Sequence, residues 1–378
     1  MKILLVGEYS RLHNSLKEGL LLLGHEVHIL GFNDGFKNYE VDFSIHKKWD
    51  SGLLKKIKIA VFKISGFDIS SFCTYRKAKN IINQLPYYDV VQLINENSFF
   101  CTYRYEKKIL NLLFAKASKK FLLSCGDDYV NVNFNFDNKD RKSVIQPYLQ
   151  GKIKKKDFLN TLKFKKNNFK KLHEFIYASV DGVIASDLDY HFALAGKSKY
   201  CGLIPNPINT TKIKFDTTHE NSVIVIFLGI NRDSYYKKGL DYFEKALEII
   251  KTKYQNKIEI IVTENLPYET YIKSYEKATI LLDQIYAFDQ GYNALEAMAK
   301  GKVVFTGAER EFETYYTILK PVAINALPDV SYLVEQLCFL IENPAAVKSI
   351  GVRARQFIEQ EHDYVSIAKK YCSVWLSK

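Results

Sequence analysis

Residues 291–305 read as one compact unit of loop, helix and strand, and this unit constrains the fold more than any other stretch. Gly291 permits a backbone conformation that most residues avoid. Asn293 is a good residue to begin a helix, and Gly301 is a good residue to end one. The apolar run 303–305 is typical of a buried strand. A helix that starts at the mouth of such a unit presents unpaired N–H groups and the positive end of its dipole, so we predict a phosphate site there.

The chain begins with the same alternation of strand and helix. We expect a buried strand at 3–6, a helix with apolar residues at helical spacing at 13–23, and a second strand at 27–30. This order is typical of the opening of a Rossmann-like domain. Further strands are predicted at 89–94, 120–124, 180–185, 223–228, 257–262, 280–283 and 303–306, and further helices at 107–116, 240–251, 268–277, 294–300, 330–342 and 345–375, the last with a break near Asp363.

The stiff, turn-prone stretch 205–209 divides the chain into two parts. We predict an α/β protein in which two Rossmann-like domains face one another across a cleft. The first spans residues 1–205 and the second residues 206–355, and a helix over 356–378 packs back towards the first. Ligands of such sheets bind beyond the carboxyl ends of the strands.

Composition limits the partners and the compartment. A formal net charge of +12 over 378 residues indicates a nucleotide, a phosphorylated lipid, a membrane surface or a nucleic acid as partner, unless the charge serves solubility alone. The six cysteines lack metal-ligand spacing, so we expect neither a metal site nor disulfides. The N-terminus does not read as a signal peptide, and no apolar run approaches the roughly 20 residues that span a bilayer. We therefore expect a cytoplasmic protein, peripheral at the inner membrane face if it binds lipid.

Two loops of the second half carry candidate residues for binding the phosphates and ribose of a nucleotide. In the loop 229–239, Arg232 offers a planar fork for phosphate oxygens and Lys238 a mobile point charge, which together would neutralise a diphosphate. The alternative is a solvated basic turn. In the helix after Gly291, the carboxylate of Glu296 would accept hydrogen bonds from ribose hydroxyls. Because Glu296 lies three residues after Asn293, a capping interaction with the helix start is the alternative.

Two loops of the first half carry candidate catalytic residues. The loop 7–14 lacks the G-x-G-x-x-G pattern of dinucleotide sites, but its His13 could reach an acceptor or a phosphate. A hydrogen bond at the helix start is the alternative for this histidine. Asp127 and Asp128 follow the strand 120–124, and only one of them need face the cleft. A turn with an aspartate–backbone hydrogen bond is the alternative there.

A lysine-rich stretch supplies a candidate membrane surface. Between residues 152 and 176, apolar residues recur at helical spacing among many lysines, which predicts a basic amphipathic helix on an anionic membrane. The alternative is a helix that packs its apolar stripe on the core and leaves its lysines in water.

Taken together, these motifs resemble the retaining glycosyltransferases of the GT-B fold (glycosyl transferases group 1), nearest to family four, over essentially the whole chain. Arg232 and Lys238 match the two cations that hold the donor diphosphate in that family. Gly291 and Glu296 match the later part of its paired-glutamate motif, where the second glutamate binds the donor ribose. Phe288 stands where the family has its first glutamate, which meets the sugar ring, and Asp289 and Asp283 are nearby substitutes for it.

The resemblance also implies a role for each domain and a reaction. Residues 1–205 would bind the acceptor and residues 206–355 the nucleotide-sugar donor, with Asp127 or Asp128 in place of a family histidine near the sugar. The implied enzyme is a hexosyltransferase-type glycosyltransferase. It moves a sugar from a nucleotide-diphosphate sugar to a glycan or lipid-linked acceptor in cell-surface polysaccharide synthesis, with retention and without metal or cofactor.

Three other functions stay open at this point. A nucleotide-sugar epimerase shares the architecture, and a non-catalytic sugar-nucleotide binder would explain Phe288. A nucleic-acid binder would use the positive charge, but the sequence contains no recognised nucleic-acid module, so we expect no nucleic-acid partner.

Overall fold

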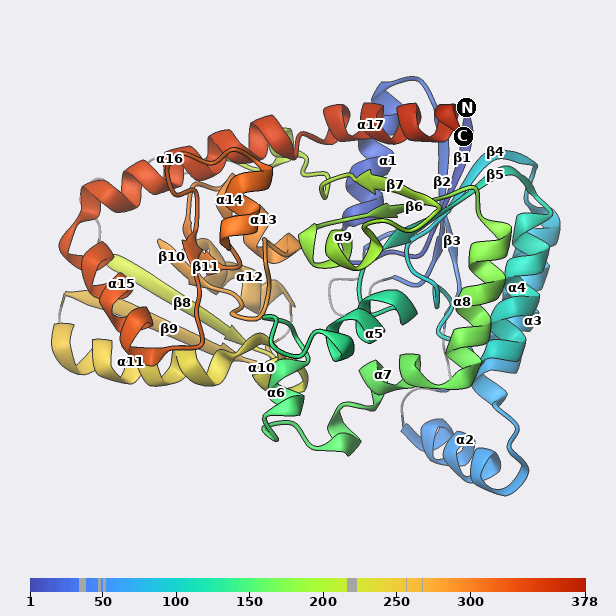
Figure 1. Cartoon of the computed structure of the whole chain (residues 1–378), viewed down its shortest axis with the longest axis horizontal. Coiled ribbons are helices and arrows are strands. Elements are labelled where there is room, and N and C mark those ends of the chain that lie inside the picture. Colours follow the sequence, from blue (N-terminus) through green and yellow to red (C-terminus); the bar gives the residue numbers. More distant parts are fainter. Residues whose placement is uncertain (34–38, 47–48, 50–51, 216–222, 256, 267) are drawn as a thin grey trace.

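The computed structural model describes residues 1–33, 39–46, 49, 52–215, 223–255, 257–266 and 268–378. It contains two α/β domains side by side, each built around a parallel sheet with helices against it (Figure 1). The architecture predicted from the alternation of strands and helices is therefore confirmed.

The N-terminal domain has a seven-stranded parallel sheet of order β3-β2-β1-β4-β5-β6-β7. The inner strand β1 is almost wholly buried, as expected for a strand covered by helices on both faces. The strands are β1 (Lys2–Val6), β2 (Glu26–Gly31), β3 (Phe43–Ser44), β4 (Tyr88–Leu93), β5 (Ala117–Ser124), β6 (Gly182–Ala185) and β7 (Tyr200–Leu203). The helices are α1 (Leu12–Leu22), α2 (Gly52–Ser65), α3 (Ile69–Gln84), α4 (Tyr103–Phe114), α5 (Tyr129–Asp137), α6 (Gln146–Leu149), α7 (Leu159–Leu162), α8 (Asn167–Ser179) and α9 (Leu188–Leu194).

The C-terminal domain has a five-stranded parallel sheet of order β12-β11-β10-β8-β9. Its strands are β8 (Ile224–Ile230), β9 (Ile258–Glu264), β10 (Ile280–Leu282), β11 (Val303–Thr306) and β12 (Ile324–Asn325). The helices that follow the domain boundary are α10 (Tyr235–Lys238), α11 (Leu240–Tyr254), α12 (Tyr268–Glu276), α13 (Tyr292–Ala299), α14 (Arg310–Tyr315), α15 (Val330–Glu342), α16 (Pro344–Glu361) and α17 (Tyr364–Ser377). Short 3₁₀ turns lie at Lys155–Asp157, Lys163–Lys165, Thr210–Lys212 and Arg232–Ser234.

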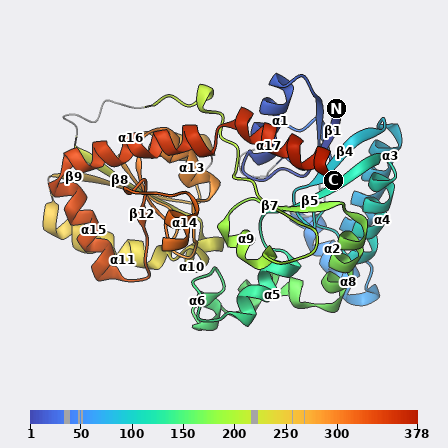
Figure 2. The same ribbon diagram turned by 45° about the horizontal axis from the view of Figure 1, so that its top comes forward.

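The last helix, α17, crosses back and packs on α1 of the N-terminal domain (Figures 1 and 2). Gly19 allows this close approach, because a Cβ atom at this position would lie 2.3 Å from the carbonyl oxygen of Tyr364. At the other end of the helix, the buried Trp375 donates a hydrogen bond from Nε1 to Oε1 of Gln92 at 3.2 Å. The C-terminal helix therefore ties the end of the chain to the first domain.

Several local predictions are confirmed at single residues. Gly301 ends α13 in the left-handed region, with φ of 81°, which most residues avoid. The long C-terminal helix breaks between Glu361 and Tyr364, at the predicted place.

The start of α13 differs from the prediction. The N-cap is Gly291 and not Asn293, and the helix begins at Tyr292. Gly291 has φ of −71°, an ordinary extended conformation, so its backbone does not require glycine. Because Gly291 lacks a side chain, the first N–H groups of α13 receive no side-chain cap from it.

The prediction of one basic amphipathic helix over 152–176 is wrong. The chain there forms 3₁₀ turns, the short helix α7 and the start of α8. Of its apolar residues, Phe158, Phe164, Leu172 and Ile176 are buried, whereas Leu159 is 50% exposed. The alternative, a helix that packs its apolar stripe on the core, is therefore right only for α8, where Leu172 and Ile176 belong to the core of the N-terminal domain.

Candidate functional site

A pocket of about 670 Å³ opens at the carboxyl ends of β8, β9 and β10, the edge where a Rossmann-like domain is expected to bind its ligand. We call it the C-terminal pocket. Its walls include Asn231, Lys238, Tyr271, Asp283 and Asn293, together with Ser10 from the N-terminal domain. Ser10 and its neighbour Arg11 both have positive φ, so a strained turn brings the first domain to this pocket.

Three polar side chains form a network on the wall of the C-terminal pocket. Nζ of Lys238 donates to Oδ1 of Asp283 at 3.1 Å, and Nδ2 of Asn293 donates to the same oxygen at 3.2 Å. The carboxylate of Asp283 is 2% exposed, while the side chain of Lys238 is 36% exposed. The ammonium group therefore keeps donor capacity for a ligand in the pocket.

Arg232 lies at the edge of this pocket, but its side chain contacts Glu264 and Tyr235 and does not line the pocket. Its guanidinium binds Glu264 through two hydrogen bonds, of 2.8 and 2.5 Å, and lies 4.7 Å from the ring centre of Tyr235. Of the described residues in this turn, Asn231, Asp233 and Ser234 line the pocket and Arg232 does not. Since exposed ion pairs of this kind contribute little to stability, Arg232 could exchange Glu264 for a phosphate at small cost.

The start of α13 faces both domains. With Gly291 as the N-cap, Glu296 is not at the third helical position, so the capping explanation of Glu296 does not hold. Burial, and then the charge of Glu296, raise the pKa of Tyr292. The Tyr292 hydroxyl lies 2.6 Å from Oγ of Ser15 and donates to the carbonyl oxygen of Pro207 at 2.8 Å. Glu296 thus lies near a contact between α13 and the N-terminal domain.

A second, smaller hollow of about 170 Å³ lies between the two domains. We call it the interdomain cavity. Asp283 lines the C-terminal pocket and the next residue, Gln284, lines this cavity, so the two hollows are neighbours. Its walls include Asp127, Asn131, Asp187 and Asp189 from the first domain and Lys237, Gln284, Asp289 and Gly291 from the second.

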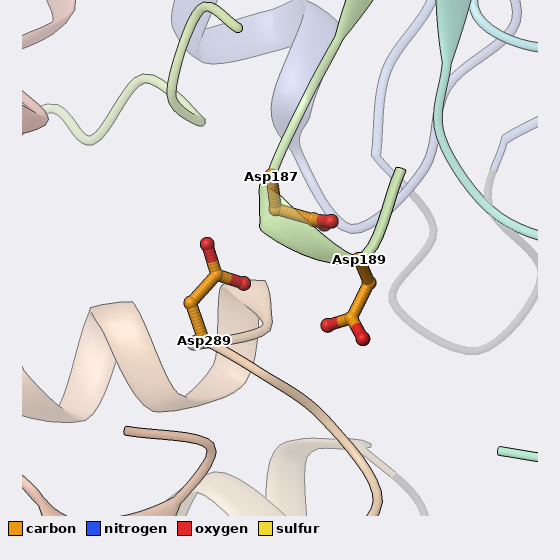
Figure 3. A group of neighbouring side chains, drawn as sticks. All are labelled: Asp187, Asp189 and Asp289. Carbon is orange, nitrogen blue, oxygen red and sulfur yellow. The ribbon is translucent and has the colours of Figure 1, made fainter. Parts of the chain in front are cut away.

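Three aspartates meet across the domain boundary at this cavity (Figure 3). Asp187 and Asp189 lie at the start of α9 and Asp289 comes from the C-terminal domain, and one oxygen from each lies within 4.8 Å of the others. Two hydrogen bonds fasten the domains here: the N–H of Leu188 donates to Asp289 at 3.0 Å, and the N–H of Phe288 donates to Asp189 at 3.1 Å. We call these residues the aspartate cluster.

Burial dominates the electrostatics of the aspartate cluster. It raises the pKa of Asp189 to about 6, against the opposing effects of the Phe288 N–H, Arg141 and Lys142. Burial and the charge of Asp189 raise the pKa of Asp289 well above its usual range. Carboxyl oxygens in this arrangement can accept hydrogen bonds from sugar hydroxyls, and they are also a donor set that hard cations such as Mg²⁺ favour.

Asp127 faces the interdomain cavity, while Asp128 does not. Burial alone would raise the pKa of Asp127, but Lys237, whose Nζ lies 2.9 Å from its Oδ2, and a hydrogen bond from Thr161 lower it. Asp128 is buried, caps α5 through the N–H of Asn131 at 2.7 Å, and has its pKa raised to about 7 by burial and then by Glu96. The expectation that only one of the pair faces the cleft is confirmed.

His13 lies in the interior of the N-terminal domain. Its imidazole is fully buried and hydrogen bonds through Nδ1 to the carbonyl oxygen of Gly7 at 2.7 Å. Burial lowers its pKa to about 4, so it is neutral at physiological pH. His13 is not among the described residues that line the C-terminal pocket or the interdomain cavity. Its position supports the alternative, a hydrogen bond at the helix start, and gives no support to a catalytic role.

Phe288 is turned away from the cavity. Its ring packs against Phe192 at 5.2 Å and against the Arg141 guanidinium, 4.0 Å from the ring centre. The next residue, Asp289, brings its carboxylate to the cavity instead. The loop therefore places an acid near the expected sugar site one position later than the family motif does.

Sequence reasoning missed Asp187, Asp189 and Lys237. The two aspartates follow β6, so the rule used for Asp127, that polar residues after a buried strand lie at the binding edge, would have found them. Lys237 could not be found in this way, because nothing local shows that it turns to Asp127 while Lys238 turns to Asp283.

Comparisons with known proteins agree with this fold. Residues 239–373 match the family described as glycosyl transferase-like. Sucrose-phosphate synthase from Thermosynechococcus elongatus is similar over 100% of this chain and 99% of its own, with a TM-score of 0.62 and 12% identity. Anabaena HepE, in complex with UDP and glucose, is similar over 100% of both chains, with a TM-score of 0.57 and 12% identity.

The chain has the GT-B fold of these proteins, and residues 239–373 match a glycosyl transferase-like family. S. aureus TarM is also similar, at a TM-score of 0.51 and 13% identity over 80% of this GT-B chain, which spans 58% of the length of TarM. No curated protein sequence matches the chain. The predicted GT-B fold is thus confirmed, and placement in family four stays a prediction.

Proposed function

We propose that this protein transfers a sugar from a nucleoside-diphosphate sugar to a glycan or lipid-linked acceptor, with retention of configuration and without a metal ion. The observation that carries the proposal is the meeting of Lys238 with the start of α13 at the C-terminal pocket. Breaking the bond between sugar and phosphate puts negative charge on the diphosphate. An ammonium group and the N-terminal end of a helix would stabilise that charge as it forms.

The interdomain cavity is the proposed place of the transferred sugar. It lies next to the pocket, and its walls offer both carboxylate acceptors and the amide groups of Asn131 and Gln284. Hydroxyl groups of a sugar need such mixed partners when they leave water. A sugar that becomes positively charged as its phosphate departs would also be stabilised by the ionised Asp127. The carboxyl groups of the aspartate cluster would hydrogen bond the sugar hydroxyls. Asp289 would thus act near the sugar in place of the family's first glutamate.

Uridine diphosphate is the proposed nucleotide. HepE has been crystallised with UDP-glucose and TarM with UDP, and both have the fold of this chain. In the C-terminal pocket, the ring of Tyr271 and the apolar Leu266 supply a surface for a base. The acceptor is proposed to belong to cell-surface polysaccharide synthesis at the cytoplasmic face of the membrane.

A thermal-shift panel of UDP, GDP, ADP, CDP and dTDP tests the donor site, each nucleotide with EDTA and with Mg²⁺. We expect UDP to raise the unfolding temperature in EDTA, and Lys238→Ala to abolish the shift. No shift with any nucleotide in either condition would refute the donor site. A shift that requires Mg²⁺ and is lost in Asp289→Asn would show that the aspartate cluster holds a metal, against the proposal.

Turnover separates the proposed enzyme from its rivals. We expect the protein to release UDP from its donor sugar slowly in water and faster with an acceptor glycan. A protein that binds UDP-sugar firmly but releases no UDP with any acceptor, and leaves the sugar unchanged, would be a binding protein. Conversion of the bound sugar to its epimer without acceptor would identify an epimerase.

A further inference from the structure

Helix α2 (Gly52–Ser65) stands apart from the packing of the N-terminal domain. None of its residues, all of which the structure describes, is buried. Figure 1 shows α2 at the end of the N-terminal domain, beyond α7 and far from the C-terminal domain. A helix of this length gains most of its stability from burying an apolar face, so an uncovered one needs explanation.

Most apolar residues of α2 form a stripe along one face, while Ile59 and Phe62, 44% and 50% exposed, lie outside it among the lysines. Leu53, Ile57, Ala60 and Ile64 recur at spacings of four, three and four residues and so lie on one side of the helix. The exposed fractions of Leu53, Ile57 and Ile64 are 72%, 41% and 88%. Large apolar side chains that gather on one exposed face mark an interaction surface. A single exposed apolar residue, such as Leu319 of the C-terminal domain, does not.

The charge of α2 points to the chemistry of the partner. The helix carries Lys55, Lys56, Lys58 and Lys63 and no acidic residue. Lysines interspersed with an apolar stripe are suited to a surface that is apolar inside and anionic at its boundary. Within the described residues, every helix is too short or too polar to cross a bilayer.

The lysine-rich stretch 152–176 provides the contrast. It has a similar pattern in sequence, but its apolar side chains Phe158, Phe164, Leu172 and Ile176 are buried. Of the large apolar side chains in this stretch, Leu159 is exposed, at 50%, and its exposed neighbours are polar or charged. Several large apolar side chains are thus exposed together on α2, whereas the described surface of 152–176 offers Leu159 alone.

We propose that α2 docks the protein onto an anionic phospholipid bilayer. Leu53, Ile57 and Ile64 enter the boundary between head groups and acyl chains, and the flanking lysines contact lipid phosphates. Docking itself does not depend on the transfer reaction. If the proposed function is correct, docking also brings the N-terminal domain, where a lipid-linked acceptor would bind, to the membrane.

Vesicle flotation tests the apolar half of this proposal. The full-length protein is mixed at low salt with vesicles of phosphatidylcholine and phosphatidylglycerol, or of phosphatidylcholine alone. We expect it to float with the anionic vesicles only, and Leu53→Ser/Ile57→Ser/Ile64→Ser to weaken binding by at least about tenfold. The matched control removes three exposed leucines elsewhere and should float as the parent does: Leu22→Ser/Leu319→Ser/Leu376→Ser.

Two lysine variants test the charged half. Lys55→Gln/Lys56→Gln/Lys63→Gln should weaken flotation and its salt dependence. The matched variant Lys155→Gln/Lys166→Gln/Lys171→Gln, in the stretch 152–176, should have a smaller effect. Equal losses in the two variants would mean that net charge alone binds the vesicles, which would overturn the assignment to α2.

Three further outcomes would overturn the proposal. One is a parent protein that stays unbound to the anionic vesicles. Another is an apolar triple variant that floats as well as the parent. The last is a parent dimer that this variant converts to monomers, without vesicle binding, which would make α2 the contact between two copies. The UDP thermal shift, measured on the same variants, should be unchanged, so failure of docking and failure of the donor site are read separately.

Discussion

The pairing of Lys238 with Asp283 gives a sharp test of the donor site. In Lys238→Met, the ammonium proposed to contact the diphosphate is lost. Hydrogen bonds to charged groups are worth about 1.5–3 kcal/mol, and each 1.4 kcal/mol is a factor of ten, so UDP affinity should fall about 10- to 150-fold. Because Asp283 is 2% exposed, its carboxylate keeps the Asn293 amide but loses its cation, and the free energy of unfolding should fall by about 1–3 kcal/mol.

The double variant Lys238→Met/Asp283→Asn separates these two effects. It removes the uncompensated carboxylate, so urea unfolding should recover much of the stability. The cation is still absent, so UDP affinity, measured by titration calorimetry, should stay low. If Lys238→Met binds UDP as the parent does, or if the double variant recovers affinity together with stability, Lys238 supports the fold only and the reasoning fails.

Four other changes test neighbouring parts of the structure. Gly291→Ala should leave the unfolding temperature unchanged, because φ is −71° and the nearest side-chain atom would lie 3.5 Å from the new Cβ. If the sugar fills the cavity, the variant should bind the donor sugar more weakly. A stable variant with parental affinity would place the sugar elsewhere. Gly19→Ala should lower the free energy of unfolding by about 1–3 kcal/mol, because the Cβ would meet the Tyr364 carbonyl oxygen, and urea unfolding at parental stability would contradict that contact. Arg232→Ala should weaken UDP binding about tenfold or more with little change in stability. Unchanged affinity by calorimetry would mean that Arg232 stays bound to Glu264 when UDP binds and does not contact the nucleotide. Burial raises the pKa of Asp189 to about 6, so the protonated carboxyl contributes stability that is fully present below the unfolded pKa of 3.8 and is lost as the pH rises through 6. The unfolding temperature of Asp189→Asn should therefore rise relative to that of the parent between pH 4 and 7. A difference in unfolding temperature that does not change with pH would refute the pKa shift.

Much of the fold could be predicted from the sequence, because short buried strands and amphipathic helices leave local patterns. The stretch 303–306 was expected as a strand and is one, and Gly301 ends α13 as predicted. Helices α2 and α3 were not predicted. Lys238 was singled out because it follows a strand, and Asn293 because it was expected to begin a helix after a strand, and both line the C-terminal pocket, while their role in binding stays a prediction.

The aspartate cluster shows where sequence reasoning ends. Asp187 and Asp289 are about a hundred positions apart in the sequence, and only the packing of the two domains brings them together. Packing also turned Asp127 to the cavity and Asp128 into a helix cap, although the two are adjacent. Direction of a side chain depends on the backbone around it, and that backbone is fixed by contacts distant in sequence.

The two lysine-rich stretches also differ in a way that the sequence does not show and the packing of the chain decides. The sequence by itself determined that both 52–65 and 152–176 carry apolar residues among many lysines. Such a pattern indicates that a segment has an apolar side, but it does not indicate which other element packs against that side. The tertiary structure covered Leu172 and Ile176 with the core of the first domain and left Leu53 and Ile64 exposed. The physical reason is that burial is a property of the whole packed chain, since apolar surface leaves water only where another element lies against it.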